Sequence, residues 1–317
     1  MPVEKKFDVI VAGELNVDLI LNRIGKFPVI GKEVLAEQMT LTLGSSSAIF
    51  ASNLSTLGSK VVFSGLLGHD NFGDHILSAL RSKGVYTSYI KQSDRYTTGA
   101  TIAFNFKEDR AMVTYPGAMK DFSMTDIPAD AFQYARHLHV SSVFLQPGLR
   151  PEITTLFKKA KDEGLTTSLD PQWDPAEAWN LDLEELLPQV DVFMPNAAEL
   201  KALTKASDWK AGLESIRQYA RKVVIKNGNT GACLWNGEAF IHQAPFLNKE
   251  VSDSIGAGDS FNAGFIHQFL QGKSDRECLE FGALTGAINT TRPGGTGAFE
   301  NLALVKTIAQ STFNYTF

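Results

Sequence analysis

Apolar residues are distributed along the chain in short runs with two different periodicities. Runs rich in β-branched and aromatic residues predict buried strands at residues 7–12, 61–67, 138–143, 165–169, 190–194 and 223–225. Apolar residues at helical spacing predict helices at residues 45–57, 72–83, 151–163, 197–204, 214–220, 260–270 and 277–290. Strands that alternate with helices are typical of an α/β fold, in which helices cover both faces of a mostly parallel sheet.

Two more polar β segments interrupt this alternation. Residues 34–43 alternate in the manner of an exposed sheet, and residues 97–106 and 111–115 have the pattern of a hairpin. We therefore predict a small β lid formed by roughly residues 13–43 and 95–118. Because no linker, internal repeat or low-complexity tract is evident, we expect a single domain over residues 1–317 that carries this lid.

The composition narrows the class of protein. Of the 317 residues, 44% are hydrophobic and 21% are charged, as in ordinary soluble globular proteins. The net charge of −5 argues against a nucleic-acid-binding surface, which needs clustered Lys and Arg. Cys233 and Cys278 are far apart in the sequence, which suits a reducing compartment without disulfides. Because residues 1–8 are charged and no apolar run could span a bilayer, we expect a cytoplasmic protein without membrane contact.

The stretch with the clearest chemistry is residues 253–259, DSIGAGD, which runs directly into a helix. The first N–H groups of a helix lack internal partners, so small residues at Gly256, Ala257 and Gly258 would let an anion approach the backbone closely. Asp259 places a carboxylate where that anion would lie, which is unfavourable unless the carboxylate has a function. Asp and Gly are also common before helices, so a structural explanation stays open at this point.

Other polar residues follow predicted strands, where ligands of open α/β sheets gather. Asn16 and Asp18 can hold hydroxyl groups there, although residues 13–18 also have the composition of a turn. Asn196 and Glu199 have the spacing of a capping box, and Lys226 can either reach a phosphate or be solvated. His137 and His139 would share one face of a strand, but without a third ligand in sight we do not predict a metal site at this pair.

Two common nucleotide-binding motifs are excluded by counting. Gly272, Lys273 and Ser274 resemble the end of a P-loop, but the earlier glycine of that motif would fall on His267. Gly13 follows the first strand, but Leu15 occupies the second glycine position of the dinucleotide fingerprint. These mismatches argue against a P-loop protein and a Rossmann dehydrogenase.

The stretch DSIGAGD resembles the D-T-x-G-A-G-D signature of ribokinase-like (PfkB-type) carbohydrate kinases, with Ser254 in place of Thr. Further segments resemble that family in the same order: residues 13–18 (G-x-x-N-x-D), 44–49 (G-G-x-x-x-N), 65–73 (G-x-x-G-x-D-x-x-G), 196–199 (N-x-x-E) and 291–295 (T-R-P-G-A). The resemblance runs from about residue 7 to residue 298. It implies a ribokinase-like three-layer sandwich with a mostly parallel central sheet and a small β lid.

The resemblance also implies roles for individual residues. Asp259 would be the catalytic base, and Gly256, Ala257 and Gly258 would bind the transferred phosphoryl group. The acceptor side would comprise Asn16, Asp18, Gly44, Ser45, Ser46 and Ile49, and the nucleotide side Lys226, Gly228 and Gly231. Asn196 and Glu199 would organise Mg²⁺ through water, and K⁺ would bind carbonyls of Asp253, Ile255, Asn289, Arg292 and Gly294. Ala298 departs from the family at a position that can offer a serine hydroxyl near this K⁺ site.

The implied activity is ATP-dependent phosphorylation of a hydroxyl of a small sugar or sugar-like acceptor, with Mg²⁺ and K⁺ as cofactors. A nucleoside kinase shares these motifs, and a non-catalytic sugar-binding regulator would share the fold, so both remain alternatives. Because Ile49 replaces the family's Asn and Met119 is also apolar, we expect an apolar patch in the acceptor pocket and poor use of ribose. Apolar residues Val34, Leu35, Met39, Leu41 and Leu43 favour a homodimer that pairs two lids.

Overall fold

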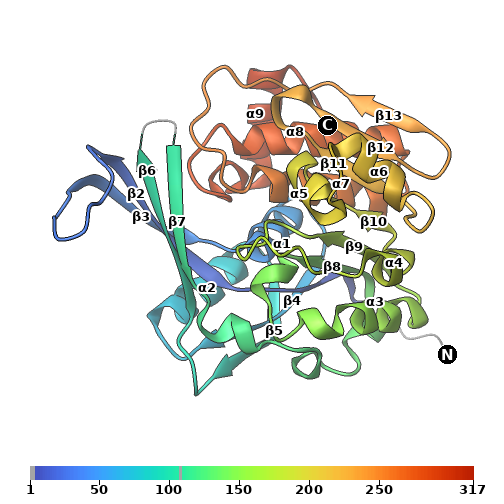
Figure 1. Cartoon of the computed structure of the whole chain (residues 1–317), viewed down its shortest axis with the longest axis horizontal. Helices are drawn as coiled ribbons and strands as arrows, with labels where there is room; N and C mark the ends of the chain where they lie inside the picture. Colours follow the sequence, from blue (N-terminus) through green and yellow to red (C-terminus); the bar gives the residue numbers. More distant parts are fainter. Residues whose placement is uncertain (1–3, 107–108) are drawn as a thin grey trace.

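A nine-stranded sheet runs through the protein, for which the computed structural model describes residues 4–106 and 109–317 (Figure 1). Its strand order is β13-β12-β11-β10-β9-β8-β1-β4-β5. Neighbouring strands are parallel from β5 to β11, whereas β12 is antiparallel to both of its neighbours, β11 and β13. The strands are β1 (Phe7–Ala12), β4 (Val61–Gly68), β5 (Tyr86–Ser93), β8 (Ala135–Ser141), β9 (Thr166–Asp170), β10 (Val192–Phe193), β11 (Val223–Lys226), β12 (Ala232–Trp235) and β13 (Phe240–Gln243).

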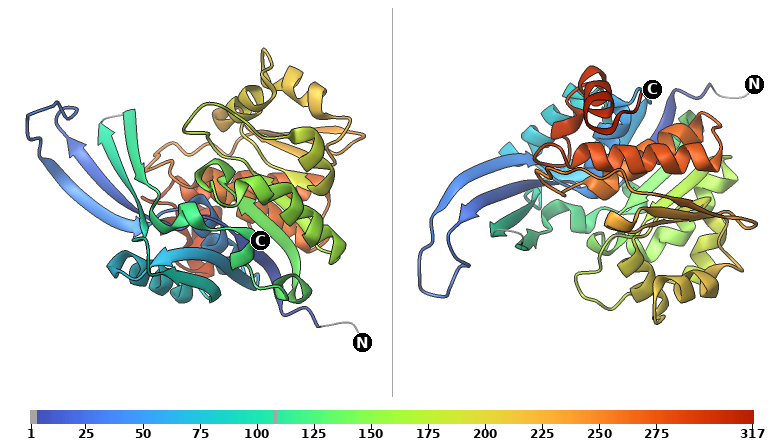
Figure 2. Two further views of the ribbon diagram at one scale, coloured as in Figure 1. Left: turned by 60° about the horizontal axis from the view of Figure 1, so that its bottom comes forward. Right: turned by 90° about the horizontal axis from the view of Figure 1, so that it is seen from above.

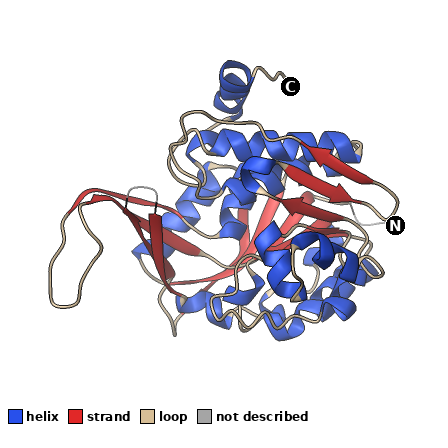
Figure 3. Cartoon of the chain, turned by 45° about the horizontal axis from the view of Figure 1, so that its top comes forward, coloured by secondary structure: helices blue, strands red, loops and turns tan. Residues whose placement is uncertain are grey.

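Helices cover both faces of this sheet, which makes the main body a three-layer sandwich (Figure 3). One face is packed by α1 (Ser46–Thr56), α2 (Asn71–Ser82), α7 (Ala257–Leu270) and α8 (Asp275–Asn289). The other face is packed by α3 (Ile153–Asp162), α4 (Leu183–Leu186), α5 (Ala197–Thr204) and α6 (Trp209–Ile216). The last helix, α9 (Leu302–Phe313), packs against α8.

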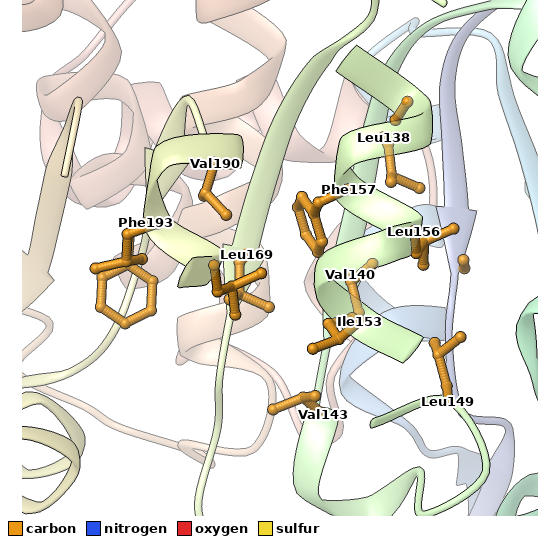
Figure 4. Packing of buried hydrophobic residues seen from close by; sticks show 14 of the residues in the cluster. Leu138, Val140, Val143, Leu149, Ile153, Leu156, Phe157, Leu169, Val190 and Phe193 are labelled. Carbon is orange, nitrogen blue, oxygen red and sulfur yellow. The ribbon is translucent and has the colours of Figure 1, made fainter. Parts of the chain in front are cut away.

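The packing of α3 shows how the apolar pattern produces these layers (Figure 4). Leu156 and Phe157 of α3 are fully buried in one cluster with Leu138 and Val140 of β8 and with Leu169 of β9. Burial of each such side chain contributes about 1.5–3 kcal/mol to the free energy of folding. The helical periodicity of α3 and the nearly continuous apolar runs of the strands therefore specify the same contact surface.

A second, four-stranded sheet projects from the main body (Figures 1 and 2). It contains β2 (Asn16–Ile24), β3 (Ala36–Leu43), β6 (Gly99–Phe106) and β7 (Asp109–Tyr115) in the order β3-β2-β6-β7. Both segments assigned to a lid in the sequence analysis contribute strands to it, and the predicted hairpin is confirmed as β6 and β7. Residues 107–108 of the second segment lie outside the described residues, and the role of this sheet as a lid stays a prediction.

Several element boundaries differ from the prediction. The helix predicted at residues 214–220 is α6, Trp209–Ile216, because the Asp208 side chain accepts hydrogen bonds from the N–H groups of Lys210 and Ala211 at 2.9 Å and begins the helix earlier. The helix predicted from residue 151 begins at Ile153 after a short 3₁₀ turn. Sequence patterns did not reveal β5, β12, β13, α4 or α9, which are short or partly exposed.

Two further observations concern the cysteines and the apolar character of the helices. Cys233 and Cys278 are both buried and unpaired. Among the described residues, no helix combines the length and the apolar character that crossing a bilayer would require.

Candidate functional site

A pocket of about 560 Å³ lies at the carboxyl ends of β9, β10 and β11, below the second sheet. The second sheet contributes Asp18, Thr101, Ala103 and Met112 to its wall. The remaining lining includes Gln172, Asn196, Glu199, Lys226, Gly228, Gly231, the segment 254–259, Ala283, Gly286 and Ala287 of α8, and Thr290 directly after α8. One continuous pocket therefore joins the acceptor and nucleotide sides that the sequence analysis distinguished.

The Gly256–Gly258 segment forms the turn into α7. Gly256 has φ of 73°, and a Cβ atom there would lie 2.6 Å from Cα of Gly295, so both the conformation and the space require glycine. A Cβ atom on Gly258 would lie 3.7 Å from Nζ of Lys226, which shows how closely this lysine approaches the turn. One part of the pocket therefore contains both the N–H groups at the start of α7 and the positive charge of Lys226.

Asp259 occupies the first turn of α7 and is 7% exposed. Its Oδ1 accepts hydrogen bonds from the Ser46 hydroxyl and from Nε2 of Gln172, the latter at 3.0 Å. Burial raises the pKa of Asp259 to about 8, the Ser46 hydrogen bond opposes that rise, and the nearby charge of Asp170 adds to it. A carboxylate with a pKa in this range can accept a proton during a reaction near neutral pH.

Lys226 belongs to a buried polar network. Its Nζ lies 2.5 Å from Oδ2 of Asp170 and 3.4 Å from Oδ1 of Asn262. The side chain of Asn262 also donates to Asp170. Lys226 is therefore ion-paired rather than simply solvated. Asp170 and Gln172 were not predicted as site residues. Both closely follow the strand predicted at residues 165–169, and that position could have revealed them.

Asn196 and Glu199 form the predicted capping box at the start of α5. The Glu199 carboxylate accepts hydrogen bonds from N and Nδ2 of Asn196 at 2.7 and 2.6 Å. In return, the backbone N–H of Glu199 donates to Oδ1 of Asn196 at 2.8 Å. Burial and the neighbouring Asp170 raise the pKa of Glu199 to about 7, although Lys226 opposes the rise. Both residues line the pocket, so a hydrated Mg²⁺ held by few protein oxygens would fit beside them.

On the acceptor side, Asp18 lines the pocket and Asn16 lies behind it. Nδ2 of Asn16 donates to Oδ1 of Asp18 and to Oγ1 of Thr101, both at 3.0 Å. A Cβ atom on Gly44 would lie only 2.3 Å from Oδ1 of Asp18, so glycine at this position makes room for the carboxylate. Asn16 and Gly44 thus support Asp18 rather than line the pocket themselves.

Glu14 is a fully buried carboxylate that was not predicted as a functional residue. It accepts from Oγ of Ser45 at 3.1 Å, from N of Ser47 at 3.1 Å and from the Ser47 hydroxyl. Burial raises the pKa of Glu14. Ser45 also caps α1 by accepting from N of Ala48 at 3.0 Å, so Glu14 and this cap together hold the 45–47 turn.

Ile49 lies beneath the pocket rather than in its wall. It is 3% exposed, and a Cβ atom on Gly295 would lie 2.3 Å from its Cδ1. Met119 is also fully buried. The expectation that an acceptor hydroxyl would meet Ile49 directly is therefore not supported, because this face of α1 packs against the turns that carry Gly256 and Gly295.

The residues assigned to a monovalent cation site come together near the start of α7. Oδ1 of Asp253 accepts from N of Ile255 at 2.9 Å, and Oδ2 accepts from N of Gly294 at 3.1 Å. Nδ2 of Asn289 donates to the carbonyl of Ile255 at 2.6 Å, whereas its Oδ1 is buried and has no hydrogen-bond partner among the described residues. Arg292 is exposed, and Ala298 is buried. The buried Oδ1 of Asn289 thus lacks a hydrogen-bond donor in the described part of the chain, and a bound cation would supply a partner for it.

Comparisons with known proteins show what the whole chain is similar to. The family model of pfkB family carbohydrate kinases matches residues 6–302. The chain is 29% identical to 2-dehydro-3-deoxygluconokinase of Bacillus subtilis over 308 residues, which cover 91% of each chain. It is 25% identical to a nucleoside kinase of Methanothermobacter thermautotrophicus over 276 residues, or 86% of each chain.

Solved structures show the same fold. Arabidopsis thaliana ribokinase with ribose and ATP matches with a TM-score of 0.81 at 24% identity, over 94% of this chain and 97% of that one. A ribokinase II structure from E. coli, in complex with ATP and Mg²⁺, matches with a TM-score of 0.80 at 21% identity, over 97% and 99%. The expected ribokinase-like three-layer fold is confirmed.

Proposed function

Since the chain belongs to the pfkB family of carbohydrate kinases and thus phosphorylates a sugar-like substrate with ATP, we propose that Asp259 is the base of this reaction. The observation that carries this proposal is the position of Asp259. It lies in the first turn of α7, directly after the Gly256–Gly258 turn, and it lines the same pocket as Asp18 and Lys226. A base there is adjacent both to an acceptor hydroxyl and to the phosphoryl group that the hydroxyl attacks.

The other residues mainly position and neutralise, as phosphoryl transfer requires. Asp18 binds hydroxyls of the acceptor, and the N–H groups of Gly256, Ala257 and Gly258 stabilise charge on the transferred phosphoryl oxygens. Gly228 and Gly231 border the nucleotide, and Lys226 adds positive charge next to Gly258. Mg²⁺, which Asn196 and Glu199 would hold through water, supplies charge neutralisation on the phosphates.

The proposed role of Asp259 predicts the behaviour of Asp259→Asn. We expect turnover to fall about 10²–10⁴-fold, the usual range for loss of a general base, while ATP affinity stays nearly unchanged. Turnover is measured as ADP release and ATP affinity by calorimetric titration. Asp208→Asn is the matched control, because it makes the same chemical change at a helix N-cap in an exposed turn. Wild-type turnover in Asp259→Asn would show that this residue is not the base.

The acceptor is a sugar or a sugar-like molecule, and a nucleoside kinase is the second candidate because relatives of both kinds match the chain. A screen of ADP release over neutral sugars, sugar acids and nucleosides separates the two candidates. Turnover confined to nucleosides would replace the sugar-kinase proposal and leave the role of Asp259 intact.

Two finer features belong to the same proposal. K⁺ binds carbonyls of the segments that Asp253 joins, and the unpartnered Oδ1 of Asn289 supports this site. Two copies of the chain pair through the second sheet, and each second sheet also closes over its own pocket as a lid. The apolar outer face of that sheet supports the pairing.

A further inference from the structure

The carboxylate of Asp259 is held through only one of its oxygens. Both hydrogen bonds that it accepts, from Ser46 and from Gln172, reach Oδ1. Oδ2 accepts none from the described part of the chain. We infer that Ser46 and Gln172 are positioning residues that orient Asp259 so that Oδ2 receives the proton of the acceptor hydroxyl. This inference rests on the proposed function, in which Asp259 is the base.

The donors and acceptors at this point are consistent with one arrangement. Nε2 of Gln172 lies 2.8 Å from Oγ of Ser46 and can only donate to it. The single O–H of Ser46 is therefore left to donate to Oδ1 of Asp259. The second N–H of Gln172 is shared between Asp259 Oδ1 and Asp170 Oδ2, both at 3.0 Å. Because both donors reach Oδ1, Oδ2 is the oxygen left to accept the proton of the acceptor's O–H group. As that O–H bond breaks, the acceptor oxygen bonds to phosphorus, and the bond from phosphorus to the leaving oxygen of ADP breaks.

The backbone around both donors is held in an unusual conformation. Gln172 has φ of 57° and Ser45, which precedes Ser46, has φ of 69°. Residues other than glycine adopt this region sparsely, and they keep it only where the surroundings impose it. Glu14 imposes it on the serine turn through hydrogen bonds from Ser45 and from both N and Oγ of Ser47. Because Ser45 and Ser47 flank Ser46, the hydrogen bonds to Glu14 help to fix Ser46 in its position beside Asp259.

The test uses the pH dependence of turnover, which a purely structural role would not change. Asp170, Lys226 and Glu14 are the charged groups that face Asp259 from β9, β11 and the turn after β1. Ser46→Ala leaves these charges in place and removes one donor to the carboxylate, so the pKa of Asp259 should rise. A base must be unprotonated to act, so the rising limb of kcat against pH should move upward by about one pH unit, and kcat at pH 7 should fall about 10-fold.

Ser46→Thr keeps the hydroxyl and should restore the wild-type limb. Gln172→Met removes the second donor from a different element, which keeps the test available should Ser46→Ala not fold. The matched controls are Ser55→Ala, which removes a hydroxyl of the same helix that donates to the Lys83 carbonyl, and Gln243→Met, which removes a surface amide. Neither control should shift the limb.

A shift in Ser46→Ala or in Gln172→Met, absent from Ser46→Thr and from both controls, supports the inference. An unshifted limb in both Ser46→Ala and Gln172→Met overturns it, even if kcat falls. The failure of the two proposals is distinguishable, because an active Asp259→Asn refutes the base itself. An inactive Asp259→Asn together with unshifted Ser46→Ala and Gln172→Met refutes only the positioning role.

Discussion

At the scale of single residues, the most consequential feature is the largely buried carboxylate of Asp259, the proposed base. The pKa of Asp259 is raised from 3.8 to about 8, mainly by burial. The folded protein therefore binds a proton on this group more tightly than the unfolded chain does. The stabilisation from that proton is fully present below pH 4 and is lost as the pH rises through about 8.

This linkage predicts a stability effect of Asp259→Asn opposite to its effect on turnover. Asparagine carries no charge, so the variant should gain melting temperature relative to wild type as the pH rises from 5 to 8. Relative to wild type, the free energy of unfolding of the variant should increase by up to about 1.4 kcal/mol per pH unit over this range. Thermal unfolding of the ligand-free protein measures this difference. Asp208→Asn, at an exposed N-cap, should show no such trend. A melting-temperature difference independent of pH would mean that Asp259 is already charged in the folded protein at pH 5.

At the scale of elements, paired residues explain why segments meet where they do. Burial lowers the pKa of His137 to about 3 and that of His139 well below its usual range, so both rings stay neutral. Ser168 lies 2.7 Å from a ring nitrogen of each, which joins β8 to β9. These hydrogen bonds give the two buried rings a structural role in the register of the parallel strands.

The loop before α7 and the segment after α8 form the second such pairing, and it predicts activation by K⁺. Asp253 holds both segments through the N–H groups of Ile255 and Gly294, so a cation bound between them would steady the Gly256–Gly258 turn. We expect higher turnover and a higher melting temperature in KCl than in tetramethylammonium chloride at equal ionic strength. Asp253→Ala should abolish the difference. Equal values in the two salts for the wild type would remove the cation site and leave the kinase proposal intact.

At the scale of the whole molecule, the projecting sheet has two unlike faces. Register places Asp18, Thr101 and Thr114 on the pocket face, and Leu41, Leu19, Ile102 and Val113 side by side on the outer face. Val113 is 64% and Met39 67% exposed, whereas Leu43 is buried at the base of the sheet and does not contribute to the exposed patch, contrary to expectation. Contiguous exposed apolar surface of this kind marks interfaces.

This face predicts a dimer at micromolar concentration. Light scattering coupled to size exclusion should give twice the mass of the chain for the wild type. Val113→Asp should shift the population to monomer by introducing a charge into the apolar face. Leu302→Asp is the control, because it makes the same change at a partly exposed apolar residue on α9. A monomeric wild type would refute the dimer but not the closure of the sheet over the pocket.

Local sequence was enough to predict most of the alternating strands and helices, the capping box of Asn196 and Glu199, and the turn before Asp259. Each depends on periodicity or on groups a few residues apart, so it is written in neighbouring positions. The family resemblance extended these local predictions to the overall fold. Tertiary structure alone decided that Ser46 meets Asp259 across 213 positions and Gln172 meets Ser46 across 126. It also directed Ile49 under the Gly256 turn. Contacts between such distant residues depend on how the layers pack, and no local pattern encodes them.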